Sequence, residues 1–324
     1  MLKLDFNRRS TIAAIAIGIA AIGIGPITAQ EFPGDRGIEL VAGYGPGGGH
    51  DTLLRTMATI LQDQGIIEVP LTVVNKPGGG SAVAMGYLNS RAGDGHYLMA
   101  VTSSHVTTPL SSNVGLEYTS FTPIARLGID PELLLVAANG PYQSIEDLKA
   151  AGKTLNVGGT ATGSIEHIVA IEIGKQAGID VNFVPFQGDS EVVTALLSGQ
   201  VDFIVSNPGT ASDFIEAGNF RALAISTEER IEAMPDVATF TEQGLDITMS
   251  LFRGVTAPAD ITPEAREWLT AKMRELSENP EWKAKYLDPN GVVGDFLPGE
   301  EFEVHLADQQ QMYAEALSSL GLGQ

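Results

Sequence analysis

Residues 37–51 read GIELVAGYGPGGGHD, and residues 69–81 read VPLTVVNKPGGGS. Each stretch begins with a short apolar run and passes into Pro-Gly-Gly-Gly. Between them, at 51–64, apolar residues recur three and four positions apart, which predicts an amphipathic helix. A strand, a glycine loop, a helix and a second strand in this order predict a βαβ unit and a parallel sheet.

The same alternation continues along most of the chain. Further strands are expected at 97–102, 132–137, 154–160, 181–186, 201–207 and 220–226. Further helices are expected at 81–90, 144–152 (capped by Ser144), 163–178, 190–200, 209–217, 262–287 and 300–320. The stretch SSHVTTPL at 103–110 is interpreted as a loop. We therefore predict the α/β class with mostly parallel sheets.

The chain also shows signs of two lobes. Its 324 residues exceed the length at which a single core stops growing, so two domains are expected. Residues 126–136 and 247–257 are interpreted as strands that cross between the lobes. The predicted first lobe is therefore discontinuous, with residues 30–128 and 250–324, and the predicted second lobe comprises residues 129–249.

The first 29 residues are typical of an export signal. Lys3, Arg8 and Arg9 precede an apolar run at 11–25, and PITA at 26–29 ends in small residues, so cleavage is expected after Ala29. The alternative is a membrane anchor, for which this run is short, because a membrane span needs about 20 residues. The mature protein is therefore expected in the periplasm.

Charge and cysteine content exclude several kinds of function. Removing three basic residues and Asp5 from totals of 19 and 40 leaves a mature formal charge of −23, which disfavours nucleic acid and anionic membranes. The chain has no cysteine, so disulfides, thiolate nucleophiles and cysteine metal sites are excluded.

The two glycine loops have the chemistry of an anion site. Each lies between a predicted strand and a predicted helix, where free backbone N–H groups and the helix dipole favour negative charge. Neither loop has the Gly-Lys-Ser/Thr of a phosphate loop or the dinucleotide fingerprint, so we expect a carboxylate. The loops follow successive strands and are expected to lie side by side. The alternative is that both are only tight turns between strand and helix.

Polar residues follow other predicted strands, at the edge where ligands of parallel sheets bind. Each group can also be explained as helix capping, and their shared location favours a site between lobes. The groups are Thr102 to His105; Thr160, Thr162, Ser164 and His167; Asn207; and Gly188 to Glu191.

Catalytic motifs are missing from the sequence. It contains neither G-x-S-x-G nor H-E-x-x-H, and no cofactor is expected. His50, Asp51 and His105 leave a metal cluster open as an alternative. We interpret His50 as a loop residue and Asp51 as the N-cap of the following helix.

An ordered set of motifs resembles one known family. The motifs are P-G-G-G-x-D at 46–51, N-x-P-G-G-G at 75–80, G-D-G-H at 93–96, G-S-x-x-H at 163–167, V-P-F-x-G-x-x-E at 184–191 and A-L-L-S-G-Q-V-D at 195–202. Together with the export signal, they resemble the extracytoplasmic substrate-binding component of tripartite tricarboxylate transporters across essentially the whole mature chain. The resemblance implies a two-lobed, type II-like periplasmic-binding-protein fold with two crossover strands.

The resemblance also implies a set of ligand-binding residues. In this family the two Pro-Gly loops hold a carboxylate through backbone N–H groups and waters. The residues implied here are Gly48, Gly49, Asp51, Gly79, Gly80, Ser81, Ser103, Ser104, Thr160, Ser164, His167, Asp189 and Glu191. Many relatives carry a tyrosine and a small residue near 186–189, whereas this chain has Phe186 and Asp189. An acid there can accept hydroxyl groups or pair with an amine.

The implied function is a monomeric periplasmic receptor that is not an enzyme. It binds a small organic carboxylate between its lobes, closes around it and presents it to two integral-membrane transporter subunits. One alternative is an exported hydrolase or isomerase that uses His50 and Asp51 or His105. Another is an accessory protein that reports ligand to a membrane kinase.

Overall fold

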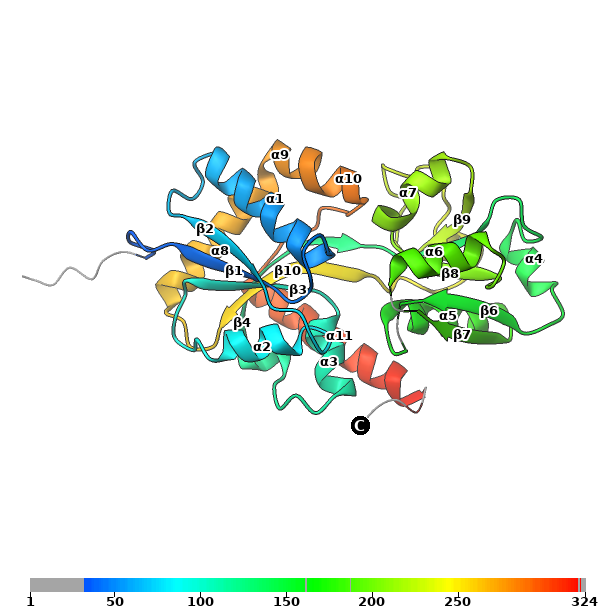
Figure 1. Ribbon diagram of the computed structural model, residues 1–324, viewed down its shortest axis with the longest axis horizontal. Coiled ribbons are helices and arrows are strands. Elements are labelled where there is room, and N and C mark those ends of the chain that lie inside the picture. The colour runs from blue at the N-terminus through cyan, green and yellow to red at the C-terminus, as the bar shows by residue number, and fades with distance from the viewer. Residues whose placement is uncertain (1–31, 161, 187, 320, 322–324) are drawn as a thin grey trace, which may run out of the picture. The chain divides into compact units, whose positions relative to one another are not determined.

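The computed structural model describes residues 32–160, 162–186, 188–319 and 321, so the predicted leader at 1–29 lies outside the described residues. Within the unit Phe32–Gln324, the strands gather in two sheets, each covered by helices (Figure 1). In this described part of the chain, no helix is long and apolar enough to cross a membrane.

The first sheet contains the two βαβ units predicted from the glycine loops. Its strands are β1 (Ile38–Ala42), β2 (Leu71–Asn75), β3 (Tyr97–Val101), β4 (Phe121–Asp130), β10 (Leu251–Pro258) and β11 (Leu297–Pro298). They lie in the order β11-β4-β10-β3-β1-β2. β1 pairs in parallel with β2 and β3, whereas β10 pairs antiparallel with β3 and β4.

Alternating side chains of β1 explain why helices cover both faces of this sheet. Ile38 and Leu40 pack in one core cluster with α1 (Gly49–Asp63) and α8 (Pro263–Glu278). Val41 packs in the opposite cluster with α2 (Ala82–Asn89), α3 (Ser104–Ser111) and α11 (Gly299–Ser319). Both faces are therefore closed to solvent, as a sheet with parallel strands requires.

The second sheet repeats this layered arrangement. Its strands are β5 (Leu133–Ala137), β6 (Leu155–Gly159), β7 (Val181–Pro185), β8 (Phe203–Ser206) and β9 (Phe220–Ile225), in the order β7-β6-β8-β5-β9. Its helices are α4 (Ile145–Lys149), α5 (Ile165–Ala177), α6 (Asp189–Leu197) and α7 (Pro208–Glu216). As predicted, Ser144 caps α4, because its hydroxyl accepts a hydrogen bond of 3.1 Å from the backbone N–H of Asp147.

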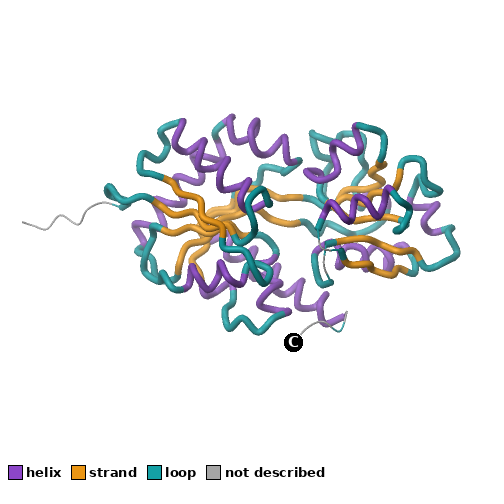
Figure 2. The backbone as a smooth tube through the Cα atoms, viewed as in Figure 1, coloured by secondary structure: helices purple, strands orange, loops and turns teal. Residues whose placement is uncertain are grey.

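Two strands connect the sheets. β4 pairs with β10 from Leu251↔Asp130 to Pro258↔Phe121. The chain leaves the first sheet after Asp130 and enters β5 at Leu133, and it returns through β10. Figure 2 shows this pair of strands running from the first sheet towards the second. The two predicted crossover strands are confirmed.

Parallel pairing is less dominant than expected. In the second sheet, β6 pairs in parallel with β7 and β8, but β5 is antiparallel to β8 and β9. The antiparallel pairs in both sheets involve β4, β5 or β10, the strands through which the chain passes between the sheets. A chain that returns beside its outgoing strand runs in the opposite direction, so the two strands pair antiparallel.

Two expectations for local structure are corrected. α1 begins at Gly49, so His50 and Asp51 are helical and the N-cap is Gly48. The stretch interpreted as a loop at 103–110 mostly forms α3. Pro109 lies inside α3. Ser103 and Ser104 stand at the start of this helix, and they suggested a loop because serine favours helix caps and turns.

The remaining short elements lie mainly in the last third of the chain. They are the 3₁₀ turns Tyr118–Ser120 and Thr241–Gln243, α9 (Pro280–Trp282), the π-helical turn Lys283–Leu287 and α10 (Asp288–Asn290).

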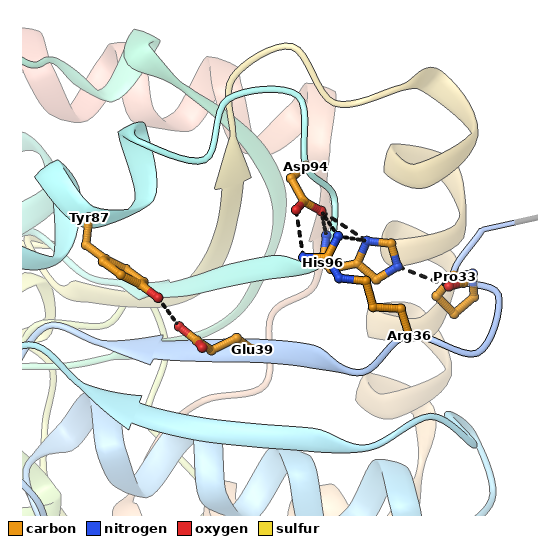
Figure 3. A network of polar contacts seen from close by, with 6 residues as sticks. All are labelled: Pro33, Arg36, Glu39, Tyr87, Asp94 and His96. Carbon is orange, nitrogen blue, oxygen red and sulfur yellow. Dashed lines mark hydrogen bonds and ion pairs between the residues drawn. The ribbon is translucent and has the colours of Figure 1, made fainter.

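A polar network fixes the amino-terminal ends of β1 and β3 (Figure 3). Asp94 forms an ion pair of 2.8 Å with Arg36, and it contacts the His96 ring at 3.0 Å. The other ring nitrogen of His96 lies 3.0 Å from the carbonyl oxygen of Pro33. The G-D-G-H motif therefore anchors the start of the described chain, at the opposite end of the strands from the glycine loops.

Candidate functional site

Three helices begin directly beyond the carboxyl ends of β1, β2 and β3. Their N-cap residues are Gly48 for α1, Ser81 for α2 and Ser103 for α3. The first N–H groups of a helix have no acceptor within the helix, and they carry the positive end of its dipole. The first sheet therefore presents three sets of backbone donors at one edge, which suits an anion.

The two glycine loops lie against each other, as predicted. The backbone N–H of Gly43 donates to Nδ1 of His50 at 3.2 Å. A Cβ at Gly43 would lie only 1.9 Å from the Ser81 hydroxyl oxygen, so the second loop packs directly on the end of β1. The Asn75 amide also donates to the carbonyl oxygen of Tyr44 at 3.0 Å. These contacts hold both loops as one structure.

The second loop has a backbone that favours glycine. Gly78, Gly79 and Gly80 have φ values of +133°, +58° and +59°, and Ser81 follows at +77°. The Thr108 hydroxyl on α3 donates to the Gly80 carbonyl at 2.7 Å and fixes the loop. Gly79 and Gly80 are exposed, so their backbone groups are accessible to a ligand.

Asp51 is buried and supports the first loop. Its carboxylate accepts hydrogen bonds from the Gly47 backbone N–H at 2.8 Å and the Asn75 amide at 2.9 Å. It also forms an ion pair of 2.8 Å with Arg55. The Arg55 hydrogen bond is the largest cause that lowers the pKa of Asp51 to about 2. Its oxygens are therefore already engaged, and Asp51 positions the loop.

Ser103 and Ser104 lie at the start of α3 and are buried. The Ser104 hydroxyl has no hydrogen-bond partner within the described part of the chain. Ser103 lies close enough to Tyr313 of α11 to affect its pKa, which burial raises. These two serines therefore begin the helix whose Thr108 holds Gly80 of the second loop.

Thr160, Ser164 and His167 form the corresponding group beyond β6. The Thr160 hydroxyl donates to a Glu166 carboxylate oxygen at 3.1 Å. Ser164 is the N-cap of α5 and accepts a hydrogen bond of 3.4 Å from the His167 backbone N–H. Nδ1 of His167 accepts from the Gly163 N–H at 3.0 Å. This group is largely occupied in building the start of α5.

Asp189 and Glu191 lie in the first turn of α6, beyond β7. Both side chains are exposed. Desolvation by the surrounding protein is the largest cause that raises the pKa of Asp189, and the positive charge of Arg253 opposes it. Asp189 therefore lies within electrostatic range of Arg253 at the junction between the sheets.

The junction itself contains charged residues that the sequence analysis missed. The Arg253 guanidinium on β10 forms an ion pair with the buried carboxylate of Asp130 at the end of β4. A Cβ at Gly49 would lie 2.9 Å from Nη1 of Arg253, so this cation is located at the start of α1. The negative charge of Asp130 raises the pKa of Arg253 against the effect of burial, so Arg253 stays positive.

Glu132 and Glu166 are further buried acids at this junction. One Glu132 carboxylate oxygen accepts a hydrogen bond of 3.0 Å from Asn207, the N-cap of α7. Burial raises the pKa of Glu132 well above its ordinary value, and the charge of Glu166 raises it further. A signal for Asp130, Glu132 and Arg253 exists in the sequence, since they are charged residues that interrupt the apolar segments at 126–136 and 247–257.

The geometry gives little support to a metal or to histidine catalysis. His50 and His105 are buried, and burial is the largest cause that lowers the pKa of each to about 3. Both rings are therefore neutral and enclosed. Among the described residues, no group of three or more His, Asp and Glu side chains is placed to hold a metal ion.

A cavity of about 750 Å³ lies elsewhere at the junction between sheets. It is lined by β4, by the segment after β9 and by α11, and it includes Arg126, Ser226, Phe252 and His305. None of the thirteen predicted ligand residues lines it. The candidate site at the helix starts and glycine loops is therefore separate from this cavity.

Two helix-covered sheets joined by a pair of crossover strands, with helix starts from both sheets around the junction, define a two-lobed solute-binding receptor. The chain belongs to the tripartite tricarboxylate transporter receptor family, whose model matches residues 54–316. The family resemblance seen in the sequence is confirmed.

Individual relatives agree with this assignment. The protein BugT of Bordetella pertussis is 29% identical over 283 residues, which cover 84% of this chain and 86% of BugT. The ligand-free crystal structure of a TctC solute-binding protein from Polaromonas is 28% identical, with a TM-score of 0.75, and the match covers 89% of this chain and 99% of that one. The R. palustris protein Rpa4515, solved with adipate, has the same fold at 22% identity, with a TM-score of 0.79, and the match covers 90% and 99% of the two chains.

Proposed function

We propose that this receptor binds a small organic carboxylate, with one carboxylate group held by the starts of α1, α2 and α3. The observation that carries the proposal is the contact between the two glycine loops at Gly43 and Ser81, which brings their backbone donors together. Arg253 beside Gly49 adds positive charge at the same place. A protein of the same fold holds adipate, a dicarboxylate, which supports this class of ligand.

The remaining residues have supporting roles in this proposal. Gly48, Gly49, Gly79 and Gly80 supply backbone donors, Ser103 and Ser104 supply hydroxyl groups, and Asp51 and Ser81 hold the loops in place. Thr160, Ser164, His167, Asp189 and Glu191 form the opposite wall, at residues 129–249. The first lobe then comprises residues 30–128 and 250–324.

The proposed working cycle depends on the two crossover strands. Binding brings the second lobe against the first by bending where β4 and β10 leave the first sheet. The closed monomer is then recognised by two integral-membrane transporter subunits. We place this cycle in the periplasm, after cleavage of the leader at Ala29, because residues 1–29 have the order of an export signal.

We also propose that the protein has no catalytic activity. A general base must be accessible and have a pKa close to the working pH. His50 and His105 are buried, and the pKa of each is lowered to about 3. Asp51 is held by Gly47, Arg55 and Asn75. These observations favour a receptor over the hydrolase or isomerase alternative.

A thermal-shift screen of residues 32–324 against organic acids tests the proposal. A ligand that binds the folded state at a hundredfold excess over its dissociation constant stabilises it by about 2.7 kcal/mol. Gly80→Ala should abolish the shift, because a Cβ there would lie 2.7 Å from the Thr108 hydroxyl oxygen and Gly80 has a positive φ.

Gly86→Ala is the matched control, since a Cβ at this position of α2 meets no atom within 4 Å. Alanine is favoured over glycine inside a helix, so the melting temperature without ligand should rise, but the shift produced by ligand should match that of the wild type. If no carboxylate shifts the melting temperature of protein stripped of bound ligand, the proposed function is wrong.

A further inference from the structure

Four acidic side chains surround the junction where the proposed ligand would reach the second sheet. Asp130 and Glu132 come from the first crossing, Glu166 from α5 and Asp189 from α6. Their charges act on one another: Asp189 affects both Asp130 and Glu166, and Glu166 affects Glu132. The acids therefore lie within electrostatic range of each other, although they come from both sheets.

One guanidinium accompanies these acids: Nη2 of Arg253 is paired with Asp130, and Nη1 lies beside Gly49 at the start of α1. Arg253 acts on Asp130, Glu132 and Asp189, but its side chain is paired directly with Asp130. Glu166 and Asp189 form no ion pair within the described part of the chain. The junction therefore holds more carboxyl groups than cations, whereas the start of α1 presents backbone donors.

Buried oxygens without partners point to the same junction. Glu132 is 0% exposed and Glu166 is 8% exposed. One Glu132 oxygen accepts a hydrogen bond from Asn207, and one Glu166 oxygen accepts one from Thr160. The second oxygen of each carboxylate has no hydrogen-bond partner among the described residues. A buried acceptor without a donor is unfavourable, so the fold retains two acceptors that a donor group would satisfy.

We propose that the ligand carries an ammonium group as well as a carboxylate, and that Glu166 and Asp189 bind this ammonium. The inference rests on the proposed carboxylate-receptor function and names its substrate class: an aminocarboxylate whose carboxylate lies at Gly49 and Arg253.

Charge explains why an ammonium fits better than a second carboxylate. Like charges brought close together repel, and the repulsion is stronger near a protein surface than in bulk water. A second carboxylate would meet this repulsion at Glu166 and Asp189, whereas an ammonium would gain a similar attraction. Burial raises the pKa of Glu166, and partial desolvation raises that of Asp189. A bound cation would lower both pKa values again, so binding of the ammonium favours the charged form of both acids.

Matched ligand pairs test this inference by calorimetry on residues 32–324. The pairs are γ-aminobutyrate with butyrate, L-aspartate with succinate, and L-glutamate with glutarate. At least one aminocarboxylate should bind ten or more times more tightly than its partner without the amine. Glu166→Gln and Asp189→Asn should each weaken that aminocarboxylate at least tenfold and reduce its preference over the amine-free partner at least tenfold.

Glu172→Gln is the matched control, because Glu172 lies on the same helix as Glu166 and pairs with Lys175 at the surface. It should bind as the wild type does. If dicarboxylates bind and the aminocarboxylates bind equally or more weakly, the ammonium inference is wrong while the receptor function stands. If none of the six compounds nor any other carboxylate binds, both are wrong.

Discussion

The carboxylate of Asp51 accepts a hydrogen bond of 2.9 Å from the side-chain amide of Asn75, although 24 residues separate them in the chain. Asp51 lies in the first turn of α1, and Asn75 is the last residue of β2. The same carboxylate also holds the Gly47 N–H. One buried side chain therefore ties the first glycine loop to the strand that leads into the second loop.

Replacing this carboxylate should affect both stability and binding. In Asp51→Ala, the Gly47 N–H and the Asn75 amide lose a charged acceptor, and we expect the free energy of unfolding to fall by about 1–3 kcal/mol. Carboxylate affinity should fall as well, because the first loop is released. Urea unfolding and calorimetry measure the two effects. Asp63→Asn, at the exposed end of the same helix, should leave both quantities unchanged.

The same residue predicts a dependence of stability on pH. The folded-state pKa of Asp51, about 2, is lower than its ordinary value of 3.8. The carboxylate therefore stabilises the fold fully above the ordinary value, and this contribution is lost as the pH falls towards 2. The difference in unfolding free energy between wild type and Asp51→Asn should shrink between pH 5 and pH 3. A difference that stays constant over this range would contradict the assignment.

Two glycines of the first loop should respond differently to alanine. A Cβ at Gly43 would overlap the Ser81 hydroxyl, whereas a Cβ at Gly45 meets nothing within 4 Å. We expect Gly43→Ala to lower the unfolding free energy by about 1–3 kcal/mol and to weaken ligand binding, because the second loop must move. Gly45→Ala should change stability by no more than about 0.5 kcal/mol. Equal behaviour of the two variants would show that the loops do not depend on this contact.

Two serine caps separate stability from binding. Ser144 caps α4 and Ser164 caps α5, and each accepts a backbone hydrogen bond from three residues further on. Replacing either with alanine should cost about 1 kcal/mol of unfolding free energy. Only Ser164→Ala should also weaken ligand binding, since only Ser164 belongs to the proposed site. If Ser144→Ala also lost affinity, the weaker binding of Ser164→Ala would reflect lower stability and not a role of Ser164 in the site.

Glu132 predicts the opposite pH trend to Asp51. Its folded-state pKa is raised, first by burial and then by Glu166 and Asp130, while Arg253 opposes this. Tyr313 is also coupled to Glu132. The folded protein therefore binds the Glu132 proton more tightly than the unfolded chain, so its stability falls as the pH rises above the ordinary value of 4.5.

Glu132→Gln removes this titration and should gain stability relative to wild type as the pH rises from 4.5 to 7. Chemical unfolding across this range measures the difference. Glu146→Gln, at an exposed position of α4, accounts for general effects of surface charge. A stability advantage of the Glu132→Gln variant that does not grow with pH would contradict the raised pKa.

Most of the secondary structure could be predicted because its pattern is local. The apolar run at 37–43 and the periodic helix at 51–64 appear as β1 and α1. The start of α1 was misplaced because three glycines obscure the beginning of the helix, and Asp51 resembled an N-cap by residue type alone. Its actual partners, Asn75 and Gly47, come from the paired strand and the loop.

The candidate site was predicted less completely than the fold. The glycine loops have a distinctive composition, so their proximity followed from the order of strands. Arg253, Asp130 and Glu132 were missed because they lie within apolar crossover segments and belong to no motif. Their chemistry depends on two strands that lie side by side and are separated by more than a hundred residues.

The sequence by itself determined the α/β class, the two crossings and the two glycine loops, because periodicity, glycine and proline act through the local backbone. Only the tertiary structure decided that Asp51 holds the first loop, that G-D-G-H anchors the start of β1, and that Arg253 pairs with Asp130 beside the start of α1. Burial and charge pairing depend on which segments meet in space, and the free energy of a buried carboxylate is set by those neighbours rather than by its position in the chain.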